Sequence, residues 1–282
     1  MFELATPRRL EMPKKISGGV DVEVFSRGDV SIFATNHTAT FLSPASRIQI
    51  HSSLRTCDNL LYEGDTTSQR RMYEFPAYAG EKYVMDTFTK RHPRNTHPLE
   101  EGCNIFELVG RHGMDKNEMG TYILLKNYIH PILAAKDVNE AEKAIDFGIK
   151  NALSIQDNFA SLNALEVRRR LMNIFKNKYL LPSSIDNAML AGILQAAASF
   201  AIIYRGFLSE YEYIGPTIKH LMKELPGRKA IVIGKMHLEA VEKALENEEF
   251  VKPPEWATFI KSMDATRFQI VDMTRKLMEL NM

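Results

Sequence analysis

The sequence predicts an α/β fold, in which a mixed, partly parallel sheet is flanked by helices and carries a large helical insertion. Three observations lead to this prediction. Apolar segments typical of strands occur near the start of the chain and again after residue 228. Helix patterns follow these segments, as they do in strand–helix–strand units. Between them, residues from about 115 to 226 have the periodicity of helices almost throughout.

The first strand–helix–strand unit is expected between residues 22 and 64. Alternating apolar residues over 22–34, with a turn at Arg27-Gly28-Asp29, predict a hairpin. Ser43-Pro44 is a typical helix start, and the short apolar segment at 60–63 predicts a strand that Gly64 closes. The second and third strands of this unit are therefore expected to be parallel neighbours.

The later elements follow from caps and apolar spacing. NIFELVG at 104–110 predicts another strand, and residues 92–98 predict a loop. Within the helical middle, we expect a helix capped by Asn139, a long helical segment from Asp157 to Tyr179, a helix capped by Ser183 or Ser184 and a helix starting at Pro216. After it, we expect a strand over 229–234, a helix over 238–245 and two helices that open at Pro253-Pro254 and Asp264.

The domain organisation follows from this order. Residues 1–20, with two prolines and two glycines, are expected to form an N-terminal arm. Residues 21–282 are expected to form a single α/β domain with a helical insertion at about 115–226. We interpret the helical middle as an insertion because strand-like segments lie on both sides of it.

Composition narrows the class of protein. The net charge is +1, which argues against nucleic acid or an acidic membrane as a partner. Cys57 and Cys103 lack metal-finger spacing, so reduced, partly buried thiols are expected. The N-terminus lacks the apolar stretch of a secretory signal, which predicts a cytoplasmic protein, or one exported without a classical signal peptide. The sequence carries no indication of an oligomeric state.

One segment resembles a membrane span in length. Residues 187–204 contain no charged side chain, but they are rich in alanine and include Gln195 and Ser199. We therefore expect a helix buried against the sheet or against other helices, with a membrane-facing or partner-facing helix as the alternative.

Three chemically reactive side chains follow predicted strands. SIFATNH ends in His37, LLYEG contains Glu63, and AIVIGKMH ends in His237. Because the carboxyl ends of parallel strands meet at one edge of a sheet, we expect these three side chains to face one cavity. Two imidazoles and a carboxylate are suited to hold a divalent metal, or to act as base, orienting group and acid without one.

These residues carry a resemblance to a known family. ATNH at 34–37, LLYEGD around Glu63 and VIGKMHLEAVEKAL around His237 are similar to the two GxxH motifs and intervening glutamate of the TraB/PrgY and TIKI family, related to erythromycin esterases and ChaN-like proteins. The resemblance covers residues 29–65 and 228–246. Ala34 stands where the family has glycine. Arg168 and Arg205 are both candidates for the family's helical arginine.

The resemblance implies a hydrolase of amide or ester bonds that acts on a peptide or a small ester or amide. His37, Glu63 and His237 would bind Mn²⁺, Co²⁺ or Zn²⁺, with Glu63 or His37 as the alternative general base. Two alternatives remain: a metal-free, erythromycin-esterase-like hydrolase, and a non-catalytic effector or peptide-binding protein. We expect His237 to line a solvent-accessible cleft, so that replacing it with alanine costs little stability.

Overall fold

The computed structural model describes residues 15–18, 22–36, 42–64, 79–155 and 157–280. It divides the chain into two compact units. Unit 1 comprises Met1–Cys103 and Ser209–Val251, and unit 2 comprises Asn104–Leu208 and Lys252–Met282. The helical insertion expected at about 115–226 thus corresponds to the first segment of unit 2, which ends earlier and is joined by the C-terminal helices. The part of the expected arm that is described, residues 15–18, forms a strand.

Unit 1 contains a six-stranded mixed sheet in the order β1-β2-β3-β6-β4-β5. β2 pairs antiparallel with β1 and β3, whereas β3, β6, β4 and β5 run parallel to one another. β3 and β4 are parallel, but the prediction that they are neighbours was wrong, because β6 lies between them. The α/β fold class with a partly parallel sheet is therefore confirmed. The strands are β1 (Lys15–Gly18), β2 (Val22–Arg27), β3 (Val30–Thr35), β4 (Asn59–Tyr62), β5 (Thr96–Pro98) and β6 (Lys229–Gly234).

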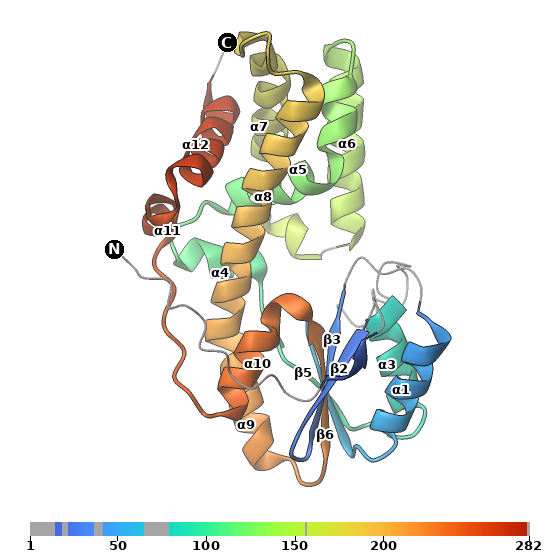
Figure 1. Ribbon diagram of the computed structural model, residues 1–282. Helices are drawn as coiled ribbons and strands as arrows, with labels where there is room; N and C mark the ends of the chain where they lie inside the picture. Colours follow the sequence, from blue (N-terminus) through green and yellow to red (C-terminus); the bar gives the residue numbers. More distant parts are fainter. Residues whose placement is uncertain (1–14, 19–21, 37–41, 65–78, 156, 281–282) are drawn as a thin grey trace. The chain divides into compact units, whose positions relative to one another are not determined.

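Helices cover both faces of this sheet (Figure 1). α1 (Pro44–Leu54) and α3 (Ala79–Thr89) pack on one face, where Ile50 and Phe88 join a buried cluster with Phe33 of β3. α9 (Gly215–Glu224) and α10 (Leu238–Leu245) pack on the other face against alternate residues of the same strands. Because both faces are covered, β3, β4 and β6 are buried along their whole length.

Unit 2 is helical in all its described elements. α5, α6 and α7 pack on one another, and α12 packs on α7. The side-chain amides of Asn173 and Asn177 on α7 donate hydrogen bonds to backbone carbonyls at the end of α12, at distances of 2.8–3.0 Å. The helices are α4 (Ile105–Arg111), α5 (Lys116–Ala134), α6 (Val138–Ile155), η2 (Asp157–Ser161), α7 (Ala164–Asn177), η3 (Lys178–Leu180), α8 (Asn187–Ser209), α11 (Trp256–Ser262) and α12 (Ala265–Glu279).

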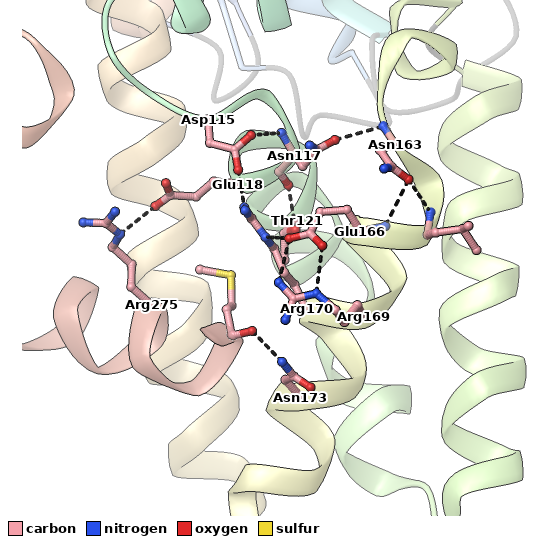
Figure 2. Close-up of polar contacts among 12 residues, drawn as sticks. Asp115, Asn117, Glu118, Thr121, Asn163, Glu166, Arg169, Arg170, Asn173 and Arg275 are labelled. Atoms are coloured by element: carbon pink, nitrogen blue, oxygen red, sulfur yellow. Dashed lines mark hydrogen bonds and ion pairs between the residues drawn. The ribbon is translucent and has the colours of Figure 1, made fainter. Parts of the chain in front are cut away.

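A polar network ties three helices of unit 2 together (Figure 2). Arg275 of α12 lies 3.2 Å from the carboxylate of Glu118 on α5, which is almost fully buried. Burial raises the pKa of Glu118, and Arg275 opposes that shift. Arg170 of α7 pairs with Glu166 and with Asp115, the N-cap of α5. These pairs fix α12 and α7 relative to α5.

Unit 2 has an aromatic core around the single tryptophan of the chain. The side chain of Trp256 is 2% exposed, and its ring lies 5.0 Å from that of Tyr204 and 5.8 Å from that of Phe259. Its indole Nε1 lies 3.4 Å from the Glu118 carboxylate, and its backbone N–H donates to the carbonyl of His112 at 2.9 Å. α11 is therefore held by packing and hydrogen bonds together.

The uncharged segment forms most of α8. One face of α8 is buried, through Leu190, Leu194 and Tyr204 among others, and the helix is hydrogen-bonded along α5. Met189, Ile203 and Phe207 lie on the other face and are 53%, 39% and 44% exposed. The helical stretch Asn187–Glu224 is long and apolar enough to cross a membrane by length and composition alone, with 39% of its most apolar window buried. Burial of this helix is thus confined to one of its faces.

Several local predictions were wrong. Residues 104–110, predicted as a strand, belong to helix α4, because the Asn104 side chain accepts hydrogen bonds from the N–H groups of Phe106 and Glu107. The predicted loop at 92–98 contains the three-residue strand β5. The caps of α6 and α8 also differ: the side chains that accept their first N–H groups are Asp137 and Asp186, not Asn139 and Ser183 or Ser184.

Candidate functional site

The carboxyl ends of three parallel strands of unit 1 meet at one edge of the sheet. Thr35 ends β3 and pairs in register with Gly234, which ends β6. Glu63 follows directly after β4, the neighbour of β6 on its other side. His237 ends η5 (Lys235–His237), the short 3₁₀ turn after β6. Strand order therefore brings Glu63 and His237 together, whereas His37 lies outside the described residues.

Glu63 is held by the backbone of β6. Its Oε2 accepts a hydrogen bond of 2.6 Å from the N–H of Gly234, and its own N–H donates to the carbonyl of Val232 at 3.0 Å. Its other oxygen, Oε1, lies 3.5 Å from Nε2 of His237. The Glu63 side chain is 16% exposed, so solvent reaches this carboxylate.

His237 is completely buried, with an exposed side-chain fraction of 0%. Its Nδ1 lies 2.8 Å from Oε1 of Glu210. The expectation of a solvent-accessible histidine was therefore wrong, because the η5 turn directs the ring between two carboxylates instead of outward. Of the residues in this cluster, Glu63 and Glu210 are the ones that solvent reaches.

The two carboxylates determine the protonation state of His237. Burial lowers the pKa of this imidazole, but hydrogen bonds and charge attraction from Glu210 and Glu63 outweigh burial and raise it to about 9. At neutral pH the ring is therefore an imidazolium, with one N–H facing each carboxylate. A neutral, base-like imidazole at this position would require a large change in its surroundings.

Further polar groups surround this cluster. Thr35 donates through its hydroxyl to the carboxylate of Glu81 on α3, which is 3% exposed. Glu100, two residues after β5, is 4% exposed and accepts a hydrogen bond from the hydroxyl of Ser209. Carboxylates thus follow β4 and β5 at the same edge of the sheet, which is the edge where ligands bind in open α/β sheets.

Glu210 was not among the residues predicted from the sequence. It begins the π-helical segment η4 (Glu210–Ile214), which joins α8 to α9. A π-helical turn is rare and is frequently found at functional sites. In the sequence, the only hint is that the first carboxylate after the uncharged helix lies here, and nothing links it to a histidine 27 residues later.

The two candidate arginines belong to unit 2, not to the unit that holds the cluster. Arg168 on α7 lies 3.2 Å from Asp146 and 3.6 Å from Glu142, both on α6. Arg205 is half-buried on α8. The contacts of Arg168 are those of a residue that links two helices.

The geometry around His237 is suited to part of a metal site. Two ligands bound to one tetrahedral ion at about 2.1 Å lie about 3.4 Å apart, close to the 3.5 Å between His237 Nε2 and Glu63 Oε1. The carboxylate of Glu210 on Nδ1 is the usual partner of a metal-ligating imidazole. Within the described ranges, however, no group of three or more His, Cys, Asp or Glu side chains is arranged to hold a metal ion. A complete site therefore requires a further ligand, such as His37.

Comparisons with protein-family models, with curated proteins and with solved structures found no match to this chain. The fold and the cluster define it as an α/β protein with a buried, carboxylate-clamped histidine at the carboxyl edge of its parallel strands.

Proposed function

We propose that this protein is a hydrolase of amide or ester bonds, similar to the TraB/PrgY and TIKI family, with its active site at the carboxyl ends of β3, β6 and β4. The observation that supports this proposal is the Glu63–His237–Glu210 cluster at that edge. Ionisable groups with strongly shifted pKa values, such as His237, are concentrated at functional sites, where they position a reactive group. Glu63, which the backbone of β6 holds and solvent reaches, is that group.

His37, Glu63 and His237 would hold a divalent ion, Mn²⁺, Co²⁺ or Zn²⁺. When bound, such an ion acidifies water and polarises a carbonyl. The chain's own residues contribute positioning: Glu210 fixes the ring of His237 through Nδ1, and the N–H of Gly234 fixes Glu63 through Oε2. With Oε2 engaged in this way, Oε1 of Glu63 is the oxygen that would bind the ion or, as the alternative, take a proton from water. The substrate is a peptide or a small ester or amide.

A second candidate function is metal-free hydrolysis, in which His37 acts as the base. The observation that favours it is the raised pKa of His237, which keeps a proton on Nε2 where a metal would otherwise bind. The imidazolium would then stabilise the charge of Glu63. A non-catalytic peptide-binding protein is the third possibility, and the same experiment distinguishes all three.

The test combines metal binding with hydrolysis. We expect Mn²⁺, Co²⁺ or Zn²⁺ to raise the melting temperature of the wild type, by an amount equivalent to about 2.7 kcal/mol when the ion is at a hundred times its Kd. Glu63→Gln should abolish both this shift and the hydrolysis of ester and amide substrates. Glu239→Gln, which removes an exposed carboxylate of α10, should change neither. Hydrolysis without any metal response would support the metal-free mechanism, and the absence of both would leave a binding protein.

A separate prediction concerns Glu210. Glu210→Gln keeps a hydrogen-bond acceptor for Nδ1 of His237 but removes the charge that makes the ring a better ligand. We expect metal affinity to fall by about 10- to 100-fold. The measurement is a calorimetric titration with the ion that stabilises the wild type. Glu224→Gln, on the exposed face of α9, is the control. Unchanged metal affinity in Glu210→Gln would limit Glu210 to a role in folding.

A further inference from the structure

A concave site on unit 1 is lined by residues other than those of the strand-end cluster. It is a surface pocket of about 670 Å³ between α1 and α3, the two helices that pack side by side on one face of the sheet (Figure 1). Arg47, His51 and Arg55 line it from α1, and Tyr83 and Arg91 line it from α3 and the turn after it. Residues spaced by four lie on one face of a helix, so the three α1 side chains point to the same side.

The charged side chains that line this pocket are all basic. Its lining contains three arginines and one histidine and no carboxylate. In the described part of the chain, none of these arginines forms an ion pair, whereas arginines elsewhere do. Those pairs are Arg27 with Glu246, Arg168 with Asp146, Arg170 with Glu166 and Arg275 with Glu118. Three uncompensated guanidinium groups on one concave surface repel one another, and an anion would relieve that repulsion.

Helix electrostatics explain only part of this arrangement. Arg55 is the C-cap of α1, where a cation is favourable because the negative end of the helix dipole lies there. Arg47, by contrast, is near the start of α1, where a cation is unfavourable and where no acidic residue is present in the first turn. The dipole of α1 therefore does not account for Arg47, whereas a contact with α3 or an anionic ligand between the helices would.

Two of the guanidinium groups are already held in place. Nη2 of Arg91 lies 2.9 Å from Nε2 of His51, and because a guanidinium only donates, the imidazole nitrogen accepts. The guanidinium of Arg47 lies over the ring of Tyr83, 5.6 Å from its centre. Such contacts lower the entropy that these side chains lose when a ligand binds.

We propose that this pocket binds the phosphoryl group of a phosphomonoester. Guanidinium groups match phosphate oxygens with paired hydrogen bonds, and three of them suit a dianion better than a single carboxylate. The volume exceeds that of a phosphate group, so the ligand has a further part, for which Tyr83 and the 72%-exposed Ile48 offer apolar surface. A phosphorylated small molecule and a phosphorylated lipid headgroup share this chemistry. The proposal does not depend on the hydrolase activity.

The test compares three single substitutions that each remove one positive charge. Arg55→Gln and Arg91→Gln change the pocket, and Arg94→Gln changes an exposed arginine three residues beyond Arg91 that does not line it. Binding of inorganic phosphate is measured by calorimetry at constant ionic strength set with chloride. Binding to phosphatidylcholine vesicles that contain phosphatidic acid is measured by sedimentation, with phosphatidylserine vesicles as the comparison.

We expect phosphate or phosphatidic acid vesicles to bind the wild type, and each pocket substitution to weaken that binding about tenfold or more. Arg94→Gln should bind like the wild type. Binding of free phosphate indicates a soluble ligand, and binding to the phosphatidic acid vesicles alone indicates a lipid. The proposal is overturned if neither phosphate nor phosphatidic acid binds better than chloride or phosphatidylserine. Equal weakening by all three substitutions would also overturn it, since it would reflect net charge alone.

Discussion

Between pH 6 and pH 9, the free energy of unfolding should fall by about 3 kcal/mol because of His237 alone. The pKa of this imidazole is raised from 6.5 to about 9 in the folded protein, where Nδ1 is hydrogen-bonded to Glu210 and the carboxylate of Glu63 lies 3.5 Å from Nε2. A raised pKa means that the folded state binds the proton more tightly than the unfolded state. The stabilisation is therefore complete below about pH 6.5 and is lost as the pH rises through about 9. Urea unfolding at a series of pH values, with chelator present, measures this loss.

Two substitutions isolate the contribution of His237. His237→Gln should remove most of the pH dependence in this range and should also be less stable at pH 6, because it leaves two carboxylates facing an uncharged group. His220→Gln, at an exposed position of α9, should retain the wild-type dependence. If His237→Gln shows the same slope as the wild type, the imidazole is not charged in the folded state and the clamped ion pair is wrong.

Replacing Trp256 with alanine should cost about 3–5 kcal/mol, which is a large part of the stability of an ordinary domain. The side chain is 2% exposed and contacts the rings of Tyr204 and Phe259, so its removal leaves a large cavity. It also removes the Nε1 hydrogen bond to the buried carboxylate of Glu118. Thermal and urea unfolding followed by circular dichroism measure the loss, since the variant has no tryptophan fluorescence.

Comparison variants separate packing from hydrogen bonding at this position. Trp256→Phe keeps most of the ring volume and should cost about 1–3 kcal/mol, chiefly through the lost N–H donor and the smaller ring. Leu165→Ala, which truncates a side chain that is 76% exposed, should change stability by less than about 0.5 kcal/mol. A loss for Trp256→Ala as small as that for Leu165→Ala would show that α11 does not contribute to the core of unit 2.

Four strands are predicted correctly from the sequence: β2 through its hairpin with β3, and β3, β4 and β6, which are buried on both faces. β3, β4 and β6 are continuous apolar runs, and such runs are conspicuous whatever their partners. The segment at 104–110 is also apolar, but it is too short to show a period. It is a helix because the side chain of Asn104 caps its first N–H groups, and this contact cannot be recognised from apolar pattern alone. β5 has three half-buried residues and no apolar run, so pairing with β4 alone makes it a strand.

The candidate site could be predicted in part, for a similar reason. Glu63 and His237 follow strands that the sequence identifies, and parallel pairing through β6 brings them within 3.5 Å. The burial of His237 could not be predicted, because it depends on Glu210. That residue reaches the ring from a π-helical turn, which no periodicity in a single sequence reveals. Whether His37 joins the cluster stays a prediction, because this residue lies outside the described part.

The strand order also has a consequence for synthesis on the ribosome. β6 lies between β3 and β4, yet it is translated after both of them and after the whole first segment of unit 2. Until β6 emerges, the facing edges of β3 and β4 expose unpaired N–H and C=O groups and apolar side chains. The nascent chain therefore exposes two unpaired, aggregation-prone strand edges for much of its translation. Pairing of strands at such a large sequence separation is also slow, which prolongs this exposure. Premature termination of translation within the helical segment would release a product in which β3 and β4 have unpaired edges, because it lacks β6, the strand that pairs with both.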